Sequence, residues 1–207
     1  NIENTKKSFM EYVSHLPENG YLVLNKDDER VYDLRNSTKA KVITVGKRNA
    51  DWTYDNITFN DDGYPTYDAF HNGKFIKRIK LNVAGTHNVF NSLCSIAMSD
   101  AYGIDIDHCA RALEKYTGAQ RRMEYKGSIN GAKVYDDYGH HPTEINAVLE
   151  SIKNKKHNKS WVVFEPHTYS RLDQHMDDFA RVLSNFDFVI VTDIYAAREK
   201  NIYNVSE

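Results

Sequence analysis

The chain has 207 residues, of which 41% are hydrophobic and 27% are charged, and its formal net charge is −2. This length suits one large domain or two small ones. The slightly acidic balance offers no basic surface for nucleic acid, and the apolar runs are too short to span a membrane, so neither partner is expected.

Residues 1–46 alternate between helical and strand patterns. Apolar residues at helical spacing predict helices over 5–16 and 31–36, and short apolar runs predict strands at 21–25 and 41–46. Because strands that alternate with helices normally lie parallel, this part predicts a parallel sheet.

The next stretch changes to the period-two alternation of strands. Three such runs, at residues 51–60, 63–71 and 74–81, are separated by Asp-Asp-Gly and Asn-Gly turns. Turns of this composition connect neighbouring strands, so the three runs predict an antiparallel meander.

From Thr86 the helical period returns. The apolar stripe of this helix ends near Gly103 and consists of Val89, Leu93, Ile96, Ala97 and Ala101. A shorter helix is predicted over 107–116. Thr117-Gly118-Ala119 is typical of a hinge, so we place a domain boundary between residues 118 and 119.

The remaining residues predict a hairpin followed by a βαβαβ run. The hairpin joins strands at 123–126 and 133–135 through an Asn-Gly turn, and a helix follows at 143–152. A buried strand is expected at 161–164 and another strand at 188–192. The helix between them is marked by Met176, Phe179, Ala180 and Leu183. We therefore expect an α/β protein whose second domain holds a doubly wound but incomplete sheet.

Residues that can carry chemistry are concentrated around the hairpin. Arg121-Arg122 precedes it, and Asp136-Asp137-Tyr138-Gly139-His140-His141-Pro142 leads from its second strand into a helix. Side chains at the carboxyl end of a strand, beside a helix N-terminus, suit an anionic ligand. Singly, an arginine pair on the surface or aspartates in a turn need no function, and it is their density that favours a site.

Asn88 and Asn91 form a second candidate group. With Thr86 as the predicted N-cap, both lie on one face of the first helical turn. Carboxamides offer donors and acceptors together, which suits the edge of an adenine ring. A polar first turn needs no ligand either, so the residues alone leave both interpretations open.

His167 and Arg171 follow the next predicted strand, so a parallel sheet would bring them to the same edge as Tyr138 and His140. An arginine can hold a carboxylate through two parallel hydrogen bonds. His140, His141 and His167 with Asp136 could in principle bind zinc. Adjacent histidines on an extended backbone point apart, however, and we expect no metal site.

The cysteines and the first residue also carry information. Cys94 and Cys109 fall on helical patterns without a CxxC motif, which favours buried, reduced thiols in a cytoplasmic protein. The chain begins at Asn1 rather than at a methionine, so we expect a fragment of a longer protein.

Four stretches resemble the Mur ligase family of peptidoglycan synthesis. They are GTHNVFNSLCSIAMSDAYGI (85–104), RRMEYKGSINGAKVYDDYGHHPTEI (121–145), VVFEPHTYSRL (162–172) and DIYAARE (193–199). The resemblance covers nearly the whole chain and is most specific from Gly85 onward. It implies that residues 1–118 are the later part of a central ATPase-type domain with an antiparallel portion. Residues 119–207 would be the first part of a Rossmann-like, amino-acid-binding domain.

For individual residues, the resemblance implies a nucleotide site and an amino-acid site. Asn88 and Asn91 would contact the adenine of ATP, Arg122 its phosphates and Asp137 its ribose. The pocket for L-alanine would consist of Tyr138, His140, His167 and Arg171. Within it, Arg171 would hold the substrate carboxylate.

The resemblance also implies a reaction. The motifs are most similar to those of Mur ligases that join L-alanine to UDP-N-acetylmuramate through an acyl phosphate, with ATP and Mg²⁺. The alternatives are a murein tripeptide recycling ligase on the same scaffold and a non-catalytic nucleotide-binding module. The sequence contains no G-x-x-x-x-G-K-[ST] phosphate loop, so we expect most Mg²⁺ ligands to lie outside it and the fragment alone to be inactive.

Overall fold

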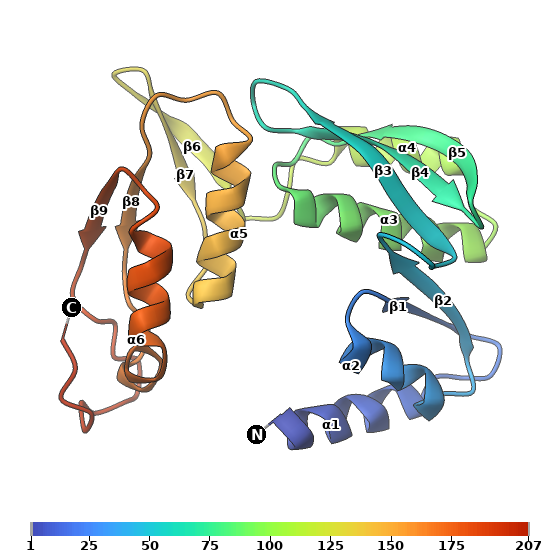
Figure 1. The fold of residues 1–207 in the computed structure, drawn as a ribbon, viewed down its shortest axis with the longest axis horizontal. Helices are drawn as coiled ribbons and strands as arrows, with labels where there is room; N and C mark the ends of the chain where they lie inside the picture. Colours follow the sequence, from blue (N-terminus) through green and yellow to red (C-terminus); the bar gives the residue numbers. More distant parts are fainter. Residues whose placement is uncertain (1, 207) are drawn as a thin grey trace. The chain divides into compact units, whose positions relative to one another are not determined.

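The computed structural model describes residues 2–206, and the chain divides into two units. Unit 1 comprises Asn1–Phe59 and Pro65–Tyr116, and unit 2 comprises Asn60–Tyr64 and Thr117–Glu207 (Figure 1). The break after Tyr116 falls beside the Thr117-Gly118-Ala119 stretch.

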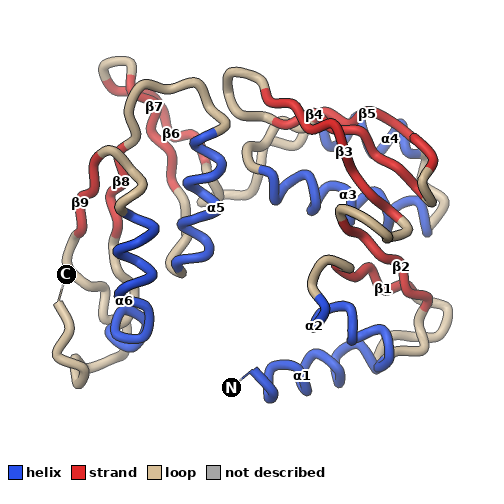
Figure 2. Tube along the Cα trace, in the orientation of Figure 1, coloured by secondary structure: helices blue, strands red, loops and turns tan. Residues whose placement is uncertain are grey.

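Unit 1 is built on one mixed sheet (Figure 2). Its strands, in sheet order, are β1 (Tyr21–Asn25), β2 (Lys41–Gly46), β3 (Trp52–Phe59), β4 (Pro65–His71) and β5 (Lys74–Lys80). The first three pair in parallel, whereas β3, β4 and β5 pair antiparallel. The predicted antiparallel meander is confirmed. It joins the parallel strands through two residue pairs, Val45 with Trp52 and Gly46 with Thr53.

Two Asn-Gly turns set the register of hairpins in this chain. Asn72 and Gly73 have φ values of 50° and 75°, and Asn130 and Gly131 have values of 50° and 85°. Positive φ at both central residues defines the type I′ turn, whose twist matches that of the flanking strands. Asparagine and glycine tolerate this conformation best, which is why the dipeptides mark these turns in the sequence.

The helices of unit 1 differ in how much they bury. They are α1 (Ile2–Ser14), α2 (Glu29–Tyr32) with the 3₁₀ turn Asp33–Ser37, α3 (Thr86–Ala101) and α4 (Ile106–Lys115). Four residues of the predicted α3 stripe have no exposed surface: Val89, Leu93, Ile96 and Ala97. In α1 only Val13 is buried in the core, joined by the partly buried Leu16 just after the helix, whereas Phe9 is 54% exposed. The α3 side of the sheet therefore holds the main core.

Unit 2 contains two separate two-stranded sheets. Its elements are β6 (Glu124–Ile129), β7 (Ala132–Asp136), α5 (Pro142–Lys153), β8 (Trp161–Phe164), α6 (Tyr169–Leu183) and β9 (Phe188–Val191). The hairpin β6–β7 is antiparallel, and β8 pairs with β9 in parallel. The α/β class is confirmed. Among the described residues β7 forms no ladder with β8, so β8 and β9 alone represent the expected doubly wound sheet.

The core of unit 2 lies on one face of β8. Phe164 packs there with Ile145 and Leu149 of α5 and with Phe179 of α6. Along a strand, side chains alternate between faces, and both helices contribute to the same core. Trp161 and Val163 therefore remain 62% and 67% exposed. The prediction of a buried strand at 161–164 is therefore wrong for the face that carries Trp161 and Val163.

The helix α6 is interrupted at His175, where φ is −128° and ψ is 20°. Leu172, Phe179 and Leu183 are buried and keep one helical spacing across this interruption, with Val182 buried beside them. Ala180 and Met176 were also expected in the apolar face, but Ala180 is exposed and Met176 is 39% exposed. The helical period identifies the stripe, but not which of its edges neighbouring elements cover. No helix in residues 2–206 has both the length and the apolar character needed to cross a membrane.

Candidate functional site

The loop that connects β7 to α5 is held by Asp137. One carboxylate oxygen accepts a hydrogen bond from the Met123 amide at 2.8 Å, and the other accepts one from the Gly139 amide at 2.7 Å. A Cβ atom at Gly139 would lie 2.9 Å from the Asp137 carboxylate, so this close approach requires glycine. Asp137 thus joins the loop to the segment before β6.

Arg122 lies in that segment, between two residues with left-handed backbone conformations. Arg121 and Met123 have φ values of 55° and 48°. Non-glycine residues adopt this region at a cost, and here backbone hydrogen bonds to Glu124 and Asp137 hold it. The Arg122 side chain is 56% exposed, and its guanidinium lies 3.6 Å from the Glu144 carboxylate. It is accessible to an anionic ligand.

The N-terminus of α5 is closed by a capping box. The amides of His140 and His141 donate to one carboxylate oxygen of Glu144, at 3.0 and 3.2 Å. In return, the His141 ring accepts a hydrogen bond from the Thr143 amide. Burial acts to raise the pKa of Glu144. The His140 amide, the charge on His140, the His141 amide and Arg122 together outweigh it, so the pKa is lowered and the carboxylate stays ionised.

The four residues predicted for the amino-acid pocket lie together in unit 2. The rings of Tyr138 and His140 are 5.3 Å apart, and those of His140 and His167 are 5.7 Å apart. Arg171 donates to the Nδ1 atom and to the carbonyl oxygen of His167, at 2.9 and 2.8 Å. On its other side, the ring of His167 stacks on Tyr195 at 5.4 Å. The carboxyl ends of β7 and β8 therefore share one cluster of rings and one guanidinium.

The hydrogen bonds fix complementary proton positions on two histidines. His140 Nδ1 donates to the Tyr138 carbonyl, so its Nε2 is an acceptor in the neutral ring. His167 Nδ1 accepts from Arg171, so its Nε2 carries the proton. Burial, followed by the charges of Arg171 and His140, lowers the pKa of His167 and favours the neutral ring. The cluster thus offers one acceptor and one donor beside a guanidinium.

Asn88 and Asn91 are placed separately, on the first turn of α3 in unit 1. The side chain of Asn91 donates to that of Asn88 at 3.3 Å, and Asn88 donates to the Ala84 carbonyl at 2.7 Å. The adjacency expected from their spacing is present. Thr86, however, is not the N-cap. That position belongs to Gly85, whose φ of 98° few other residues adopt, and Thr86 begins the helix.

Sequence reasoning missed three residues that support the cluster: Glu144, Tyr195 and Glu199. Tyr195 lies just after β9 as His167 lies just after β8, and a parallel bridge joins the two. The same argument that selected His167 would have selected it. Glu199 accepts from the amide and hydroxyl of Ser170, which fixes the start of α6. No short-range pattern reveals that contact.

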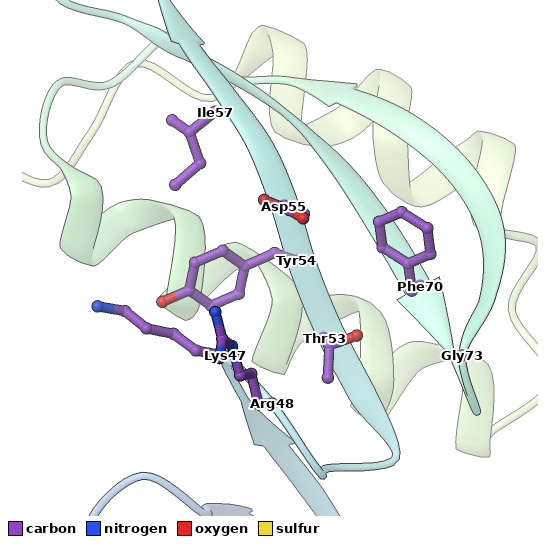
Figure 3. A pocket seen from close by; sticks show the side chains of 8 residues that line it. All are labelled: Lys47, Arg48, Thr53, Tyr54, Asp55, Ile57, Phe70 and Gly73. Atoms are coloured by element: carbon purple, nitrogen blue, oxygen red, sulfur yellow. The ribbon is translucent and has the colours of Figure 1, made fainter.

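A separate groove of about 470 Å³ lies in unit 1, beside β3 and the residues that directly follow β2 (Figure 3). Its lining is Lys47, Arg48, Thr53, Tyr54, Asp55, Ile57, Phe70 and Gly73. It contains none of the predicted site residues. Within residues 2–206, no three His, Cys, Asp or Glu side chains are grouped so that they could hold a metal ion.

Two family models match the chain in succession. The Mur ligase middle domain matches residues 1–99, and the glutamate ligase domain of Mur ligases matches residues 121–205. A UDP-N-acetylmuramate–L-alanine ligase from Caldicellulosiruptor saccharolyticus is 45% identical over 99% of the chain. One from Acetivibrio thermocellus is 41% identical over 97% of it. The chain spans less than half of these relatives, 45% and 43% of their lengths.

Solved structures agree with this fold. The UDP-N-acetylmuramate–alanine ligase of Thermotoga maritima superposes with a TM-score of 0.77 at 29% identity, over 94% of the chain and 42% of that structure. A murein peptide ligase from Psychrobacter arcticus superposes with a TM-score of 0.62 at 24% identity, over 91% of the chain and 40% of that structure. The second likeness concerns the fold alone.

Proposed function

The chain belongs to the Mur ligase family, and we propose that the longer protein it comes from joins L-alanine to UDP-N-acetylmuramate. ATP would first phosphorylate the muramate carboxylate. The alanine amine would then attack the acyl phosphate, forming the amide and releasing phosphate. ATP and both substrates place this reaction in the cytoplasm.

The observation that carries the proposal is the cluster of Tyr138, His140, His167 and Arg171. An α-amino acid presents a carboxylate and an amine close together. The guanidinium of Arg171 has one nitrogen committed to His167, which leaves the rest of its fork for a carboxylate. The Nε2–H of His167 would donate to the same group, and the Nε2 of His140 would accept from the amine.

Each unit, taken by itself, offers candidate residues for the nucleotide. Asn88 and Asn91 present carboxamides suited to adenine, and the exposed guanidinium of Arg122 suits a phosphate. Asp137 would reach the ribose through the lone pairs that its two backbone hydrogen bonds leave open. Mg²⁺ would neutralise charge on the phosphates. The described residues offer no three-ligand group, so we infer that other parts of the protein hold the ion.

The test is a substrate comparison with the full-length protein. Phosphate release is measured with ATP, UDP-N-acetylmuramate and either L-alanine or the tripeptide L-alanyl-γ-D-glutamyl-meso-diaminopimelate. We expect release with alanine and little with the tripeptide. Preference for the tripeptide would assign the protein to the recycling ligases instead. Nucleotide binding without turnover on either substrate would identify a binding module.

A further inference from the structure

The carboxylate of Glu144 has more partners than a helix cap needs. A capping box requires one hydrogen bond from this side chain to the N-cap amide, here that of His141. The same oxygen also accepts from the amide of His140, and the second oxygen lies 3.6 Å from Arg122. The first oxygen also lies 3.7 Å from Nδ1 of the His140 ring, so every contact apart from the cap bond goes to a residue of the proposed ligand sites.

These contacts join two segments that are also held together by the Arg121–Asp136 ion pair, by Arg121 over the Tyr138 ring and by hydrogen bonds to backbone amides. The amide of Tyr138 donates to the Arg121 carbonyl at 2.8 Å, and Asp137 accepts from the Met123 amide. Arg122 lies between Arg121 and Met123, and its side chain contacts Glu144. Among the described residues, Glu144 is thus the contact that links the Arg122 guanidinium to the loop of Tyr138 and His140.

We propose that Glu144 is a positioning residue that couples the phosphate-binding arginine to the amino-acid pocket, an inference that rests on the proposed function. Its carboxylate orients the Arg122 guanidinium for the nucleotide phosphates. At the same time it fixes the backbone at His140, and hence the ring that faces His167. In this proposal Glu144 contacts neither substrate itself, and its effect passes through Arg122 on one side and His140 on the other.

Two substitutions separate these roles. Glu144→Gln retains one oxygen for the amides of His140 and His141 but turns a neutral amide toward Arg122. Losing a partly exposed ion pair should raise the ATP KM about two- to fivefold, while the alanine KM stays within about twofold of the parent. Glu144→Ala removes the amide contacts as well, and should raise the alanine KM about tenfold. Glu150→Gln, on an exposed face of the same helix, should change neither constant.

A double-mutant cycle in the full-length protein decides whether Glu144 acts through Arg122. ATP affinity is measured by calorimetry without alanine, so this arm does not depend on turnover. In an Arg122→Ala background, Glu144→Gln should cause no further loss of ATP affinity. Additive losses would overturn the proposal. The proposal would also fail if Glu144→Gln raised the alanine KM as much as Glu144→Ala does. Equal increases in both KM values together with a lowered melting temperature would overturn it as well, because they would show that Glu144 acts only as a helix cap. If the parent protein fails to use alanine while the cycle still shows coupling, the proposed function fails and the link between Arg122 and Glu144 stands.

Discussion

Arg171 and His167 behave as one group, because a single guanidinium nitrogen donates twice to the histidine. This arrangement orients both side chains before any ligand arrives. The sequence placed each residue after a strand, and so predicted that they would lie near Tyr138 and His140. It could not predict the proton positions, because those depend on which way each ring and guanidinium turns within its loop. The amide bonds of Glu144 are equally local, and a carboxylate three residues after the residue that precedes the helix is a capping-box signal that could have identified it.

Replacing Arg171 should affect one substrate selectively. In the full-length protein, Arg171→Ala is expected to raise the alanine KM about ten- to a hundredfold, since it removes a charge-assisted contact with the carboxylate. Arg171→Lys should restore part of this, because an ammonium lacks the planar fork. Steady-state kinetics with each substrate varied in turn measures the two KM values. Arg122→Ala should instead raise the KM for ATP more than the KM for alanine. An alanine KM changed less than about twofold by Arg171→Ala would remove the residue from the pocket.

His167 should make the stability of unit 2 depend on pH. Its pKa is lowered in the folded state, chiefly by burial, whereas an unfolded histidine titrates near about 6.5. As the pH falls below that value, the unfolded chain binds the proton first, so the free energy of unfolding should decline until the folded-state pKa is passed. Urea denaturation at a series of pH values measures the slope. His167→Gln should flatten it, and His157→Gln, in an exposed loop, should not. An unchanged slope in His167→Gln would assign the decline to other groups.

At the scale of elements, α3 is the best-determined part of unit 1. Its apolar stripe could be predicted from the sequence because four apolar residues follow the helical period without interruption and pack directly against the sheet. The burial of α6 and β8 was misjudged for one reason. The apolar stripe of α6 continues across the interruption at His175, but its edge at Met176 and Ala180 is left uncovered, and in β8 an apolar run does not reveal which faces are covered. The hydrophobic period of a sequence indicates the local backbone geometry, whereas the burial of each face depends on which other helices and strands pack against it.

A cavity in α3 should therefore be costly. Leu93 has no exposed surface, and Leu93→Ala is expected to lower the free energy of unfolding of unit 1 by about 2–5 kcal/mol. Ser95→Ala, on the exposed side of the same helix, should cost less than about 0.5 kcal/mol. Urea denaturation of the two variants against the parent makes the comparison. Similar losses at both positions would mean that helix propensity, rather than packing, sets the stability.

At the scale of the whole molecule, the chain holds separate cores in its two units, and the proposed site residues are distributed between them. In the sequence, the strand and helix patterns restart after a short Thr-Gly-Ala stretch, and the boundary placed between residues 118 and 119 stays a prediction. The sequence did not predict which strands distant along the chain pair with one another. The expectation that β7 would extend the β8–β9 sheet rested on chain order alone, which does not determine hydrogen bonding between strands.

The 207-residue chain should not hydrolyse ATP in response to alanine. Its sequence has no phosphate loop, and its described residues form no three-ligand metal group. A phosphate-release assay on the purified chain, with both substrates and Mg²⁺, tests this against the full-length protein as positive control. Turnover by the chain alone would show that its own residues suffice for phosphoryl transfer.

The two tryptophans give each unit its own optical signal. Trp52 is 1% exposed and stacks on His71, whereas Trp161 is 62% exposed and stacks on Phe188. An indole shielded from water emits at shorter wavelengths and resists quenching by iodide. Trp161→Phe should therefore leave a blue-shifted, poorly quenched emission that changes when unit 1 unfolds. Trp52→Phe should leave a red-shifted, readily quenched emission that follows unit 2. The open face of β8 thus supplies a built-in fluorophore with which the unfolding of the two units can be followed separately.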